Sequence, residues 1–270
     1  MRAKNVISIP NAERPVNATS AAQRWFRRLA PVAFWLAVWQ LASILVEQEI
    51  LIASPAETLE SLASLVFEAQ FWKSIASSLG HVALGFLLAL LAGTACAAIS
   101  SRFAFVRELL APLVAAIKAV PVASFIILVL IWASSKNLSV IISFLMAFPI
   151  MYTNLLEGIL RTDSKLLEMA DVFRVSAFDR VRFIYCSQVL PFFQAACSLA
   201  LGMAWKAGIA AEVIGLPDTS IGENLYQAKI YLNTPDLFAW TLIIICISIA
   251  IERAFAKMTN YAVSVVERST

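Results

Sequence analysis

Residues 79–100 read LGHVALGFLLALLAGTACAAIS and contain no Asp, Glu, Lys or Arg. A membrane-spanning helix needs about 20 largely apolar residues, and this run reaches that length. Five more such runs lie at residues 29–46, 109–133, 138–158, 192–215 and 237–251, and we expect the last to extend to residue 254 or 255. The sequence therefore predicts an all-α integral membrane protein with six transmembrane helices.

The composition of the whole chain supports this prediction. Of its 270 residues, 60% are apolar and only 14% are charged, and the mean hydropathy is +0.79. A soluble domain carries about a quarter charged residues. These values exclude a disordered chain, a coiled coil and a nucleic-acid-binding domain, and they make a water-soluble globule an unfavourable interpretation.

The charged residues are distributed unevenly along the chain. Residues 1–28 hold six bases and one acid, whereas the connection at residues 47–78 holds five glutamates and one lysine. Basic loops remain in the cytoplasm. We therefore expect a cytoplasmic basic segment at residues 1–28, a transmembrane domain at residues 29–255 and a cytoplasmic tail at residues 256–270, with both termini inside.

The outer connection contains a signal for the start of a helix. Ser54 is suited to be an N-cap, Pro55 to be the first helical residue, and Glu57 follows three residues after the cap. Apolar residues then recur on one helical face at Leu59, Leu62 and Val66. We predict an amphipathic outer segment at residues 54–70.

The inner loop at residues 159–191 predicts two short helices with a break at residues 174–176. Asp163 is placed to cap the first helix, and Ser176 with Asp179 forms a capping box for the second. The first helix carries an apolar face. Its members are Leu166, Met169, Ala170 and Phe173. Such a face packs on the bundle or on a partner, and the residues alone leave both alternatives open.

This loop resembles the EAA loop of binding-protein-dependent ABC transporter permeases. The pattern begins at Glu168-Met169-Ala170 and closes at Leu190-Pro191. Segments in the same order resemble the nitrate, sulfonate, taurine and bicarbonate branch of that family. They are LIASPAETLESL (51–62), SSLGHVALGFLLALLAG (77–93), KAVPVASF (118–125), FPIMYTNLLEGI (148–159), LALGMAWKAGIAAEVIG (199–215) and LPDTSIGENLYQA (216–228).

Four positions depart from the family pattern. Arg174 stands where the family has Gly, so we expect the bend to use Val175 or Ser176, or to be less sharp. The usual first Leu-Pro is missing, with Ser187 in its place, and His81 and Ser198 stand where arginine is usual. These departures indicate a divergent member.

The resemblance implies a type I ABC importer permease fold with a cytoplasmic coupling helix. It implies a separate ATPase in two copies, an external solute-binding protein and a second copy of the permease in the inner membrane. Leu166, Met169, Ala170 and Phe173 would face the ATPase or the bundle. Glu168 would make a charge contact or a cap, and Arg174 would stand at the bend. No GxxxxGK[ST] motif occurs in the chain, so ATP hydrolysis is expected elsewhere.

Ionisable residues inside spans are costly and become functional candidates. Lys118 lies in the third run, beside Pro121, and Lys206 and Glu212 lie in the fifth. Lys206 and Glu212 are six residues apart, so they do not face each other on one helix. Each is either part of a pathway or gate, or a snorkelling or structural group.

Other functions fit the sequence less well. A secondary transporter or channel needs no ATPase, and the coupling subunit of a vitamin importer docks ATPases without this outer segment. A membrane enzyme has no support, because the chain offers no HExxH, no paired Asp motif and only one histidine. The four cysteines form no CxxC pair, so neither a metal centre nor a cofactor is expected.

Overall fold

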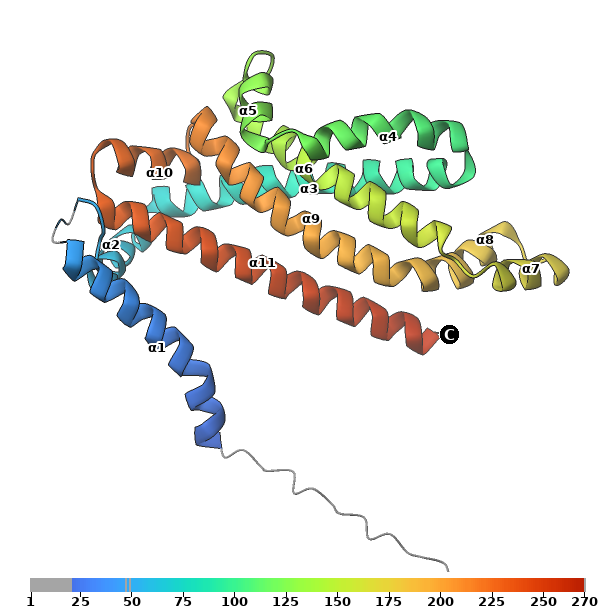
Figure 1. Cartoon of the computed structure of the whole chain (residues 1–270), viewed down its shortest axis with the longest axis horizontal. Helices are drawn as coiled ribbons and strands as arrows, with labels where there is room; N and C mark the ends of the chain where they lie inside the picture. The colour runs from blue at the N-terminus through green and yellow to red at the C-terminus, as the bar shows by residue number, and fades with distance from the viewer. Residues whose placement is uncertain (1–20, 47, 49, 270) are drawn as a thin grey trace, which may run out of the picture. The chain divides into compact units, whose positions relative to one another are not determined.

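The computed structural model describes residues 21–46, 48 and 50–269, and every regular element within them is helical (Figure 1). These residues divide into two compact units, at residues 1–55 and 56–270. The first twenty residues of the predicted basic segment lie outside the described part of the chain.

The first unit contains helix α1 (Ala21–Val46), whose apolar part, Leu29–Val46, has the length and hydropathy of a membrane span. None of its side chains in that span is buried within the protein. The segment that follows is tied back to this helix, because Trp39 Nε1 donates to the Ala53 carbonyl over 3.0 Å.

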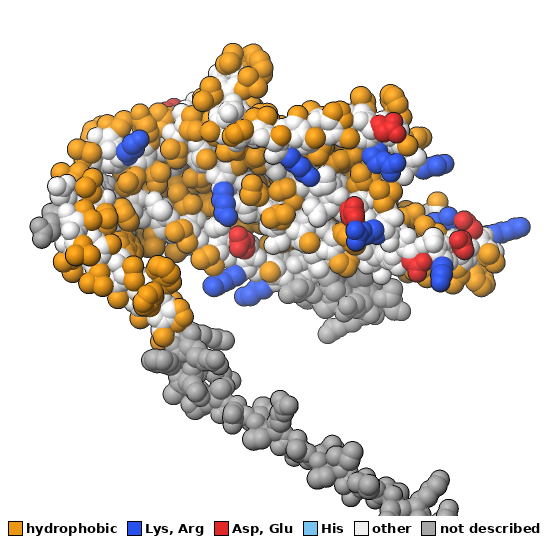
Figure 2. Space-filling view, viewed as in Figure 1, with side chains coloured by type: hydrophobic (Ala, Val, Ile, Leu, Met, Phe, Trp, Pro, Cys, Tyr) orange, Lys and Arg blue, Asp and Glu red, His pale blue; other side chains and the backbone are white. Residues whose placement is uncertain are grey.

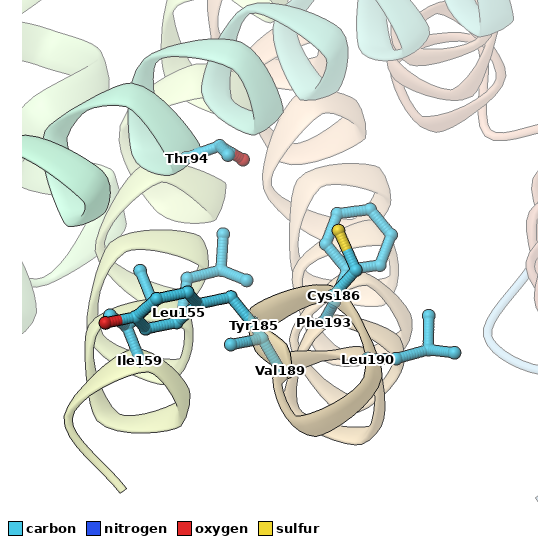
Figure 3. A pocket seen from close by; sticks show the side chains of 8 residues that line it. All are labelled: Thr94, Leu155, Ile159, Tyr185, Cys186, Val189, Leu190 and Phe193. Carbon is cyan, nitrogen blue, oxygen red and sulfur yellow. The ribbon is translucent and has the colours of Figure 1, made fainter. Parts of the chain in front are cut away.

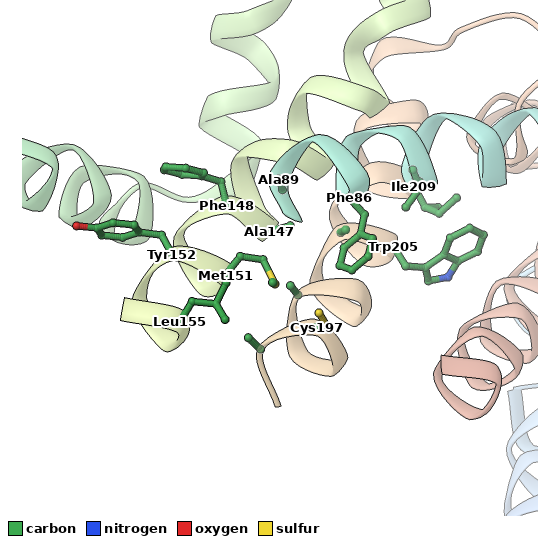
Figure 4. Close-up of a cluster of buried hydrophobic side chains, with 14 of the residues drawn as sticks. Phe86, Ala89, Ala147, Phe148, Met151, Tyr152, Leu155, Cys197, Trp205 and Ile209 are labelled. Atoms are coloured by element: carbon green, nitrogen blue, oxygen red, sulfur yellow. The ribbon is translucent and has the colours of Figure 1, made fainter. Parts of the chain in front are cut away.

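The second unit is built around three long helices, α3 (Ala69–Arg102), α6 (Ser135–Leu160) and α9 (Cys186–Gly215). Large side chains such as Phe86, Met151 and Trp205 fill the core between them (Figure 4). Small residues bring the backbones together elsewhere, as is usual between membrane helices. Ser143 Oγ on α6 donates to the Ala204 carbonyl on α9 over 3.0 Å, next to Gly208.

The predicted third span is not one helix. It consists of α4 (Ala104–Ala119) and α5 (Val122–Leu130), which meet at an angle of 102°. Pro121 has no N–H to continue the helix, and it forces the preceding Val120 into extended backbone (φ −83°, ψ 132°). Helix α5 then packs on α6 and α9 through Ile126. Six spans result only if this bent pair counts as one.

The two ends of the second unit carry different connections (Figure 1). Helices α2 (Pro55–Val66) and α10 (Ile221–Ile230) lie at one end, and α7 (Ser164–Val172) and α8 (Ala177–Asp179) lie at the other. The prediction that Leu59, Leu62 and Val66 form one apolar face of α2 is only partly correct. Leu59 is exposed, while Leu62, Leu65 and Val66 pack on the core, because the helix presents the side with buried Thr58.

The last helix, α11 (Thr234–Ser269), continues well past the predicted end of the sixth span at residue 255. No helix-breaking residue interrupts the sequence there. Helix α11 packs on α9 and α10, and Asp236 in its first turn accepts a 2.6 Å hydrogen bond from Ser61 on α2.

Candidate functional site

The inner loop begins with a capped helix. Asp163 Oδ1 accepts a hydrogen bond from the Lys165 N–H over 2.9 Å, and α7 runs from Ser164 to Val172. The Asp163 N–H in turn donates to Gln188 on α9 over 3.0 Å. The predicted N-cap is therefore present, and it also fastens the start of α7 to the bundle.

The bend after α7 is made by Arg174, contrary to the expectation that Val175 or Ser176 would take over. Arg174 has φ 52°, the left-handed conformation that glycine adopts most easily. The Val175 N–H donates to the Ala170 carbonyl over 2.9 Å, which is the closing bond of a Schellman motif. Arg174 therefore adopts the left-handed conformation that glycine would adopt in this turn.

The second short helix of the loop is not separate, so that expectation was wrong. Ser176 Oγ accepts from the Asp179 N–H over 3.2 Å, which starts α8 at Ala177. Helix α8 passes into a π-helix, η1 (Arg180–Tyr185), and then into α9 without a break. No glycine or proline occurs between residues 177 and 190 to stop it.

An ion pair holds the two arms of the loop together. Arg180 Nη2 on η1 lies 2.6 Å from Asp171 Oδ1 on α7. This guanidinium is partly shielded, with its side chain 28% exposed. The loop is therefore a hairpin whose two helical arms are connected by this ion pair.

The predicted apolar face of α7 divides into two parts. Ala170 is 1% exposed and Leu166 is half-buried, so both point toward the protein. Met169 and Phe173 are 50% and 74% exposed. Glu168 and Arg174 are exposed as well.

Two further apolar residues of the same loop are exposed. Val172 is 79% exposed and follows Met169 at i+3 on the same helical side, and Phe178 on α8 is 73% exposed. We call Met169, Val172, Phe173 and Phe178 the loop patch. The i, i+3, i+4 spacing of Met169, Val172 and Phe173 was the sequence signal for Val172, and it was overlooked.

Charged side chains surround the end of the molecule that carries this patch. Figure 2 shows them gathered around α7 and α8, whereas hydrophobic side chains dominate the rest of the visible surface. An apolar patch within a charged, water-exposed loop is typical of a protein contact.

A small apolar hollow lies where the loop joins the bundle (Figure 3). It measures about 270 Å³ and opens between α6 and the start of α9. Its lining consists of Thr94, Leu155, Ile159, Tyr185, Cys186, Val189, Leu190 and Phe193. These side chains offer no set of ligands for a metal, and no such cluster occurs among the described residues.

The structure does not bring the predicted pathway residues together. Lys118 lies in the last turn of α4, where its Nζ is 3.3 Å from Thr153 Oγ1 on α6. Pro121 is the N-cap of α5 at the 102° bend. Lys206 is exposed on α9, on a different side from the buried Glu212.

Glu212 braces the junction of three helices. Its Oε2 accepts from Ser78 Oγ on α3 over 2.7 Å and from the Gly222 N–H at the start of α10 over 3.3 Å. Ser78 Oγ also accepts from the Ile221 N–H over 2.9 Å. The carboxyl therefore stands at the N-terminus of α10, where the free N–H groups favour an acceptor.

The sequence of this chain matches a known protein family. Residues 85–254, more than half of the chain, match the family described as binding-protein-dependent transport system inner membrane component. The chain belongs to this family. It is thus the inner membrane permease component of an ABC importer, a transport subunit that is not itself the ATPase. Membership implies an ATPase and a binding protein as partners.

Several relatives of this permease carry names that state a solute. A putative aliphatic sulfonates transport permease protein of Bacillus subtilis is 25% identical over 90% of this chain and 86% of its own length. The taurine transport system permease protein of Escherichia coli is 22% identical over 79% and 80% of the two chains. A nitrate import permease protein of Synechococcus elongatus is 25% identical over 72% and 73%.

Proposed function

We propose that the loop patch is the surface through which this permease receives the motion of its ATPase. The observation that carries the proposal is the exposure of Met169, Val172 and Phe173 on a loop whose two arms are connected by the Arg180–Asp171 ion pair. Exposed apolar side chains on a helix provide a surface against which a partner protein packs. A movement of the ATPase would then shift the α7 hairpin as one body and, through η1, the start of α9.

In this proposal the loop lies in the cytoplasm with both termini, and α2 and α10 face outward. The basic loop and the acidic outer connection support that orientation. Two copies of the permease flank the pathway and two ATPase subunits dock on them. Glu168 and Arg174 lie exposed beside the patch and would contribute charged contacts at its rim.

We also propose that the solute is a small anion. The relatives named for sulfonates, taurine and nitrate support this class. The exposed cation Lys118, with the bend at Pro121, would attract and admit such a solute along the pathway. Glu212 would act on the pathway only indirectly, by fixing α10.

Copurification of the ATPase with substituted permease tests the docking surface. Met169→Asp places a charge in the contact and should release most of the ATPase, because an unpaired charge in a desolvated interface costs several kcal/mol. Ser164→Asp adds the same charge at an exposed position about 140° away around α7 and should retain the ATPase. Full retention by Met169→Asp would refute the docking role.

Ala170→Asp is unsuitable for this test. Ala170 is buried within the permease itself, so a charge there would disturb the packing of α7 on the bundle as well as any contact with the ATPase.

A further inference from the structure

Two charged residues on neighbouring helices lie close together on the surface of the bundle. Lys206 on α9 and Glu252 on α11 line the same hollow, which measures about 390 Å³ and is otherwise lined by residues of α9. Glu252 was not singled out from the sequence, although the sixth span includes it once that span is extended to residue 254 or 255. Charged side chains of both signs interrupt the hydrophobic surface over α9 and α11 (Figure 2).

Because Gly202 has no side chain, the Glu252 carboxylate on α11 can approach the backbone of α9 closely. A Cβ at this position would lie 3.3 Å from Glu252 Oε1, so the carboxylate rests against the α9 backbone. Lys206 is one turn further along α9 and lines the same hollow as Gly202. The hydrogen bond from Trp205 Nε1 to the Ile244 carbonyl, 3.2 Å long, fixes the register of α9 against α11.

The two charges do not satisfy each other within one chain. Neither Lys206 nor Glu252 forms an ion pair with any residue whose side chain the structure describes. Both lie in helices that span the membrane, where charged side chains face protein or water because exposure to lipid is costly. Something other than lipid therefore covers this hollow in the assembled transporter.

We infer that a second copy of this chain covers the hollow, with Lys206 of each copy paired to Glu252 of the other. The inference rests on the two permease copies of the proposed function. A two-fold axis along the membrane normal keeps every residue at its depth, and Lys206 and Glu252 both flank Gly202. A surface with one cation and one anion at the same depth is complementary to itself, as an isologous interface requires.

Charge reversal in separate chains tests this pairing. Lys206→Glu gives a chain with two acids in the hollow, and Glu252→Lys gives a chain with two bases. Homodimers of either variant should lose uptake by roughly tenfold or more, because like charges would face each other. A mixed dimer, isolated with two different affinity tags, has like charges within each chain but opposite charges across the interface. It should recover uptake.

The mixed dimer separates the inference from its alternatives. If Lys206 and Glu252 acted within one chain, the mixed dimer would stay inactive, and that result would overturn the inference. Full uptake by either single variant would overturn it as well. Recovery of the ATPase in the same preparations reports on the loop patch independently, so failure of the pairing is distinguishable from failure of the proposed coupling.

Disulfide crosslinking covers the case in which the reversed charges prevent folding. In a background without the four natural cysteines, one tagged copy carries Lys206→Cys and the other carries Glu252→Cys. Each chain then has a single thiol, so only a bond between copies can form. We expect a covalent dimer from this pair and none when Lys229→Cys on α10 replaces Lys206→Cys. No dimer from the 206 and 252 pair would contradict the inference.

Discussion

Arg174 occupies the position at which the pattern of the resembled EAA loop has glycine. At φ 52° its Cβ is crowded by the backbone, which costs about 1 kcal/mol relative to glycine. Arg174→Gly should therefore stabilise the Schellman turn. Hydrogen exchange of the Val175 amide, which donates to Ala170, should slow about fivefold.

Arg174→Ala is the matched control for this prediction. It removes the charge and the long side chain but keeps the Cβ that causes the strain, so exchange at Val175 should not slow. Equal slowing in both variants would attribute the effect to the arginine side chain rather than to the backbone.

The Glu212 carboxylate is a second single residue with a structural role, because it accepts hydrogen bonds from two buried donors. Glu212→Ala would leave the Ser78 hydroxyl and the Gly222 N–H without this acceptor, with a loss of roughly 2 to 5 kcal/mol in stability. Glu212→Gln keeps one oxygen acceptor and should lose much less. Thermal unfolding of the purified permease compares the two, and equal stability of wild type and Glu212→Ala would contradict the bracing role.

At the scale of elements, the α6–α9 contact depends on the absence of a side chain at Gly208. A Cβ there would lie 2.5 Å from Ser143 Oγ on α6 and 2.6 Å from Val82 Cγ2 on α3, so Gly208→Ala should force the helices apart and cost about 1–3 kcal/mol. Gly80→Ala has no atom within 4 Å of the new Cβ and should be tolerated. The two melting temperatures measure the difference, and equal values would exclude close packing as the reason for Gly208.

The local features of these elements were readable from the sequence where local chemistry determines them. Asp163 and Ser176 cap helices as their spacing predicts, because a cap depends only on neighbouring residues. The sequence could not decide whether the span bends at Pro121, because proline also occurs inside α4, α6 and α9 without ending them. Packing of α5 on α6 and α9 favours the bent form.

The candidate site was predictable only in part, for a related reason. The sequence indicated that α7 has an apolar face, but not which members of that face point inward. Ala170 and Met169 are neighbours in sequence, yet one is buried and the other half exposed, because the packing of α7 on η1 decides this. Glu252 was missed because its significance depends on Lys206, which is distant in sequence and close in the hollow.

At the scale of the whole molecule, the permease places its two kinds of contact at opposite ends of one bundle. Glu212 fixes α10 at one end, and the loop patch occupies the other end on a hairpin that continues directly into α9. Helix α9 thus connects both ends and also packs on α3, α6 and α11. In the proposed coupling, a displacement of α7 would be transmitted through α9 to the end of the bundle that carries α10.

Photocrosslinking from position 173 in the assembled transporter tests the coupling claim most directly. Phe173 is replaced with a benzophenone amino acid, a side chain of similar character at a site 74% exposed. The control is the same replacement at Trp132, which is 77% exposed and lies between α5 and α6. We predict a covalent adduct of permease and ATPase from position 173 and none from position 132. An intact complex that gives no ATPase adduct at position 173 would contradict the account.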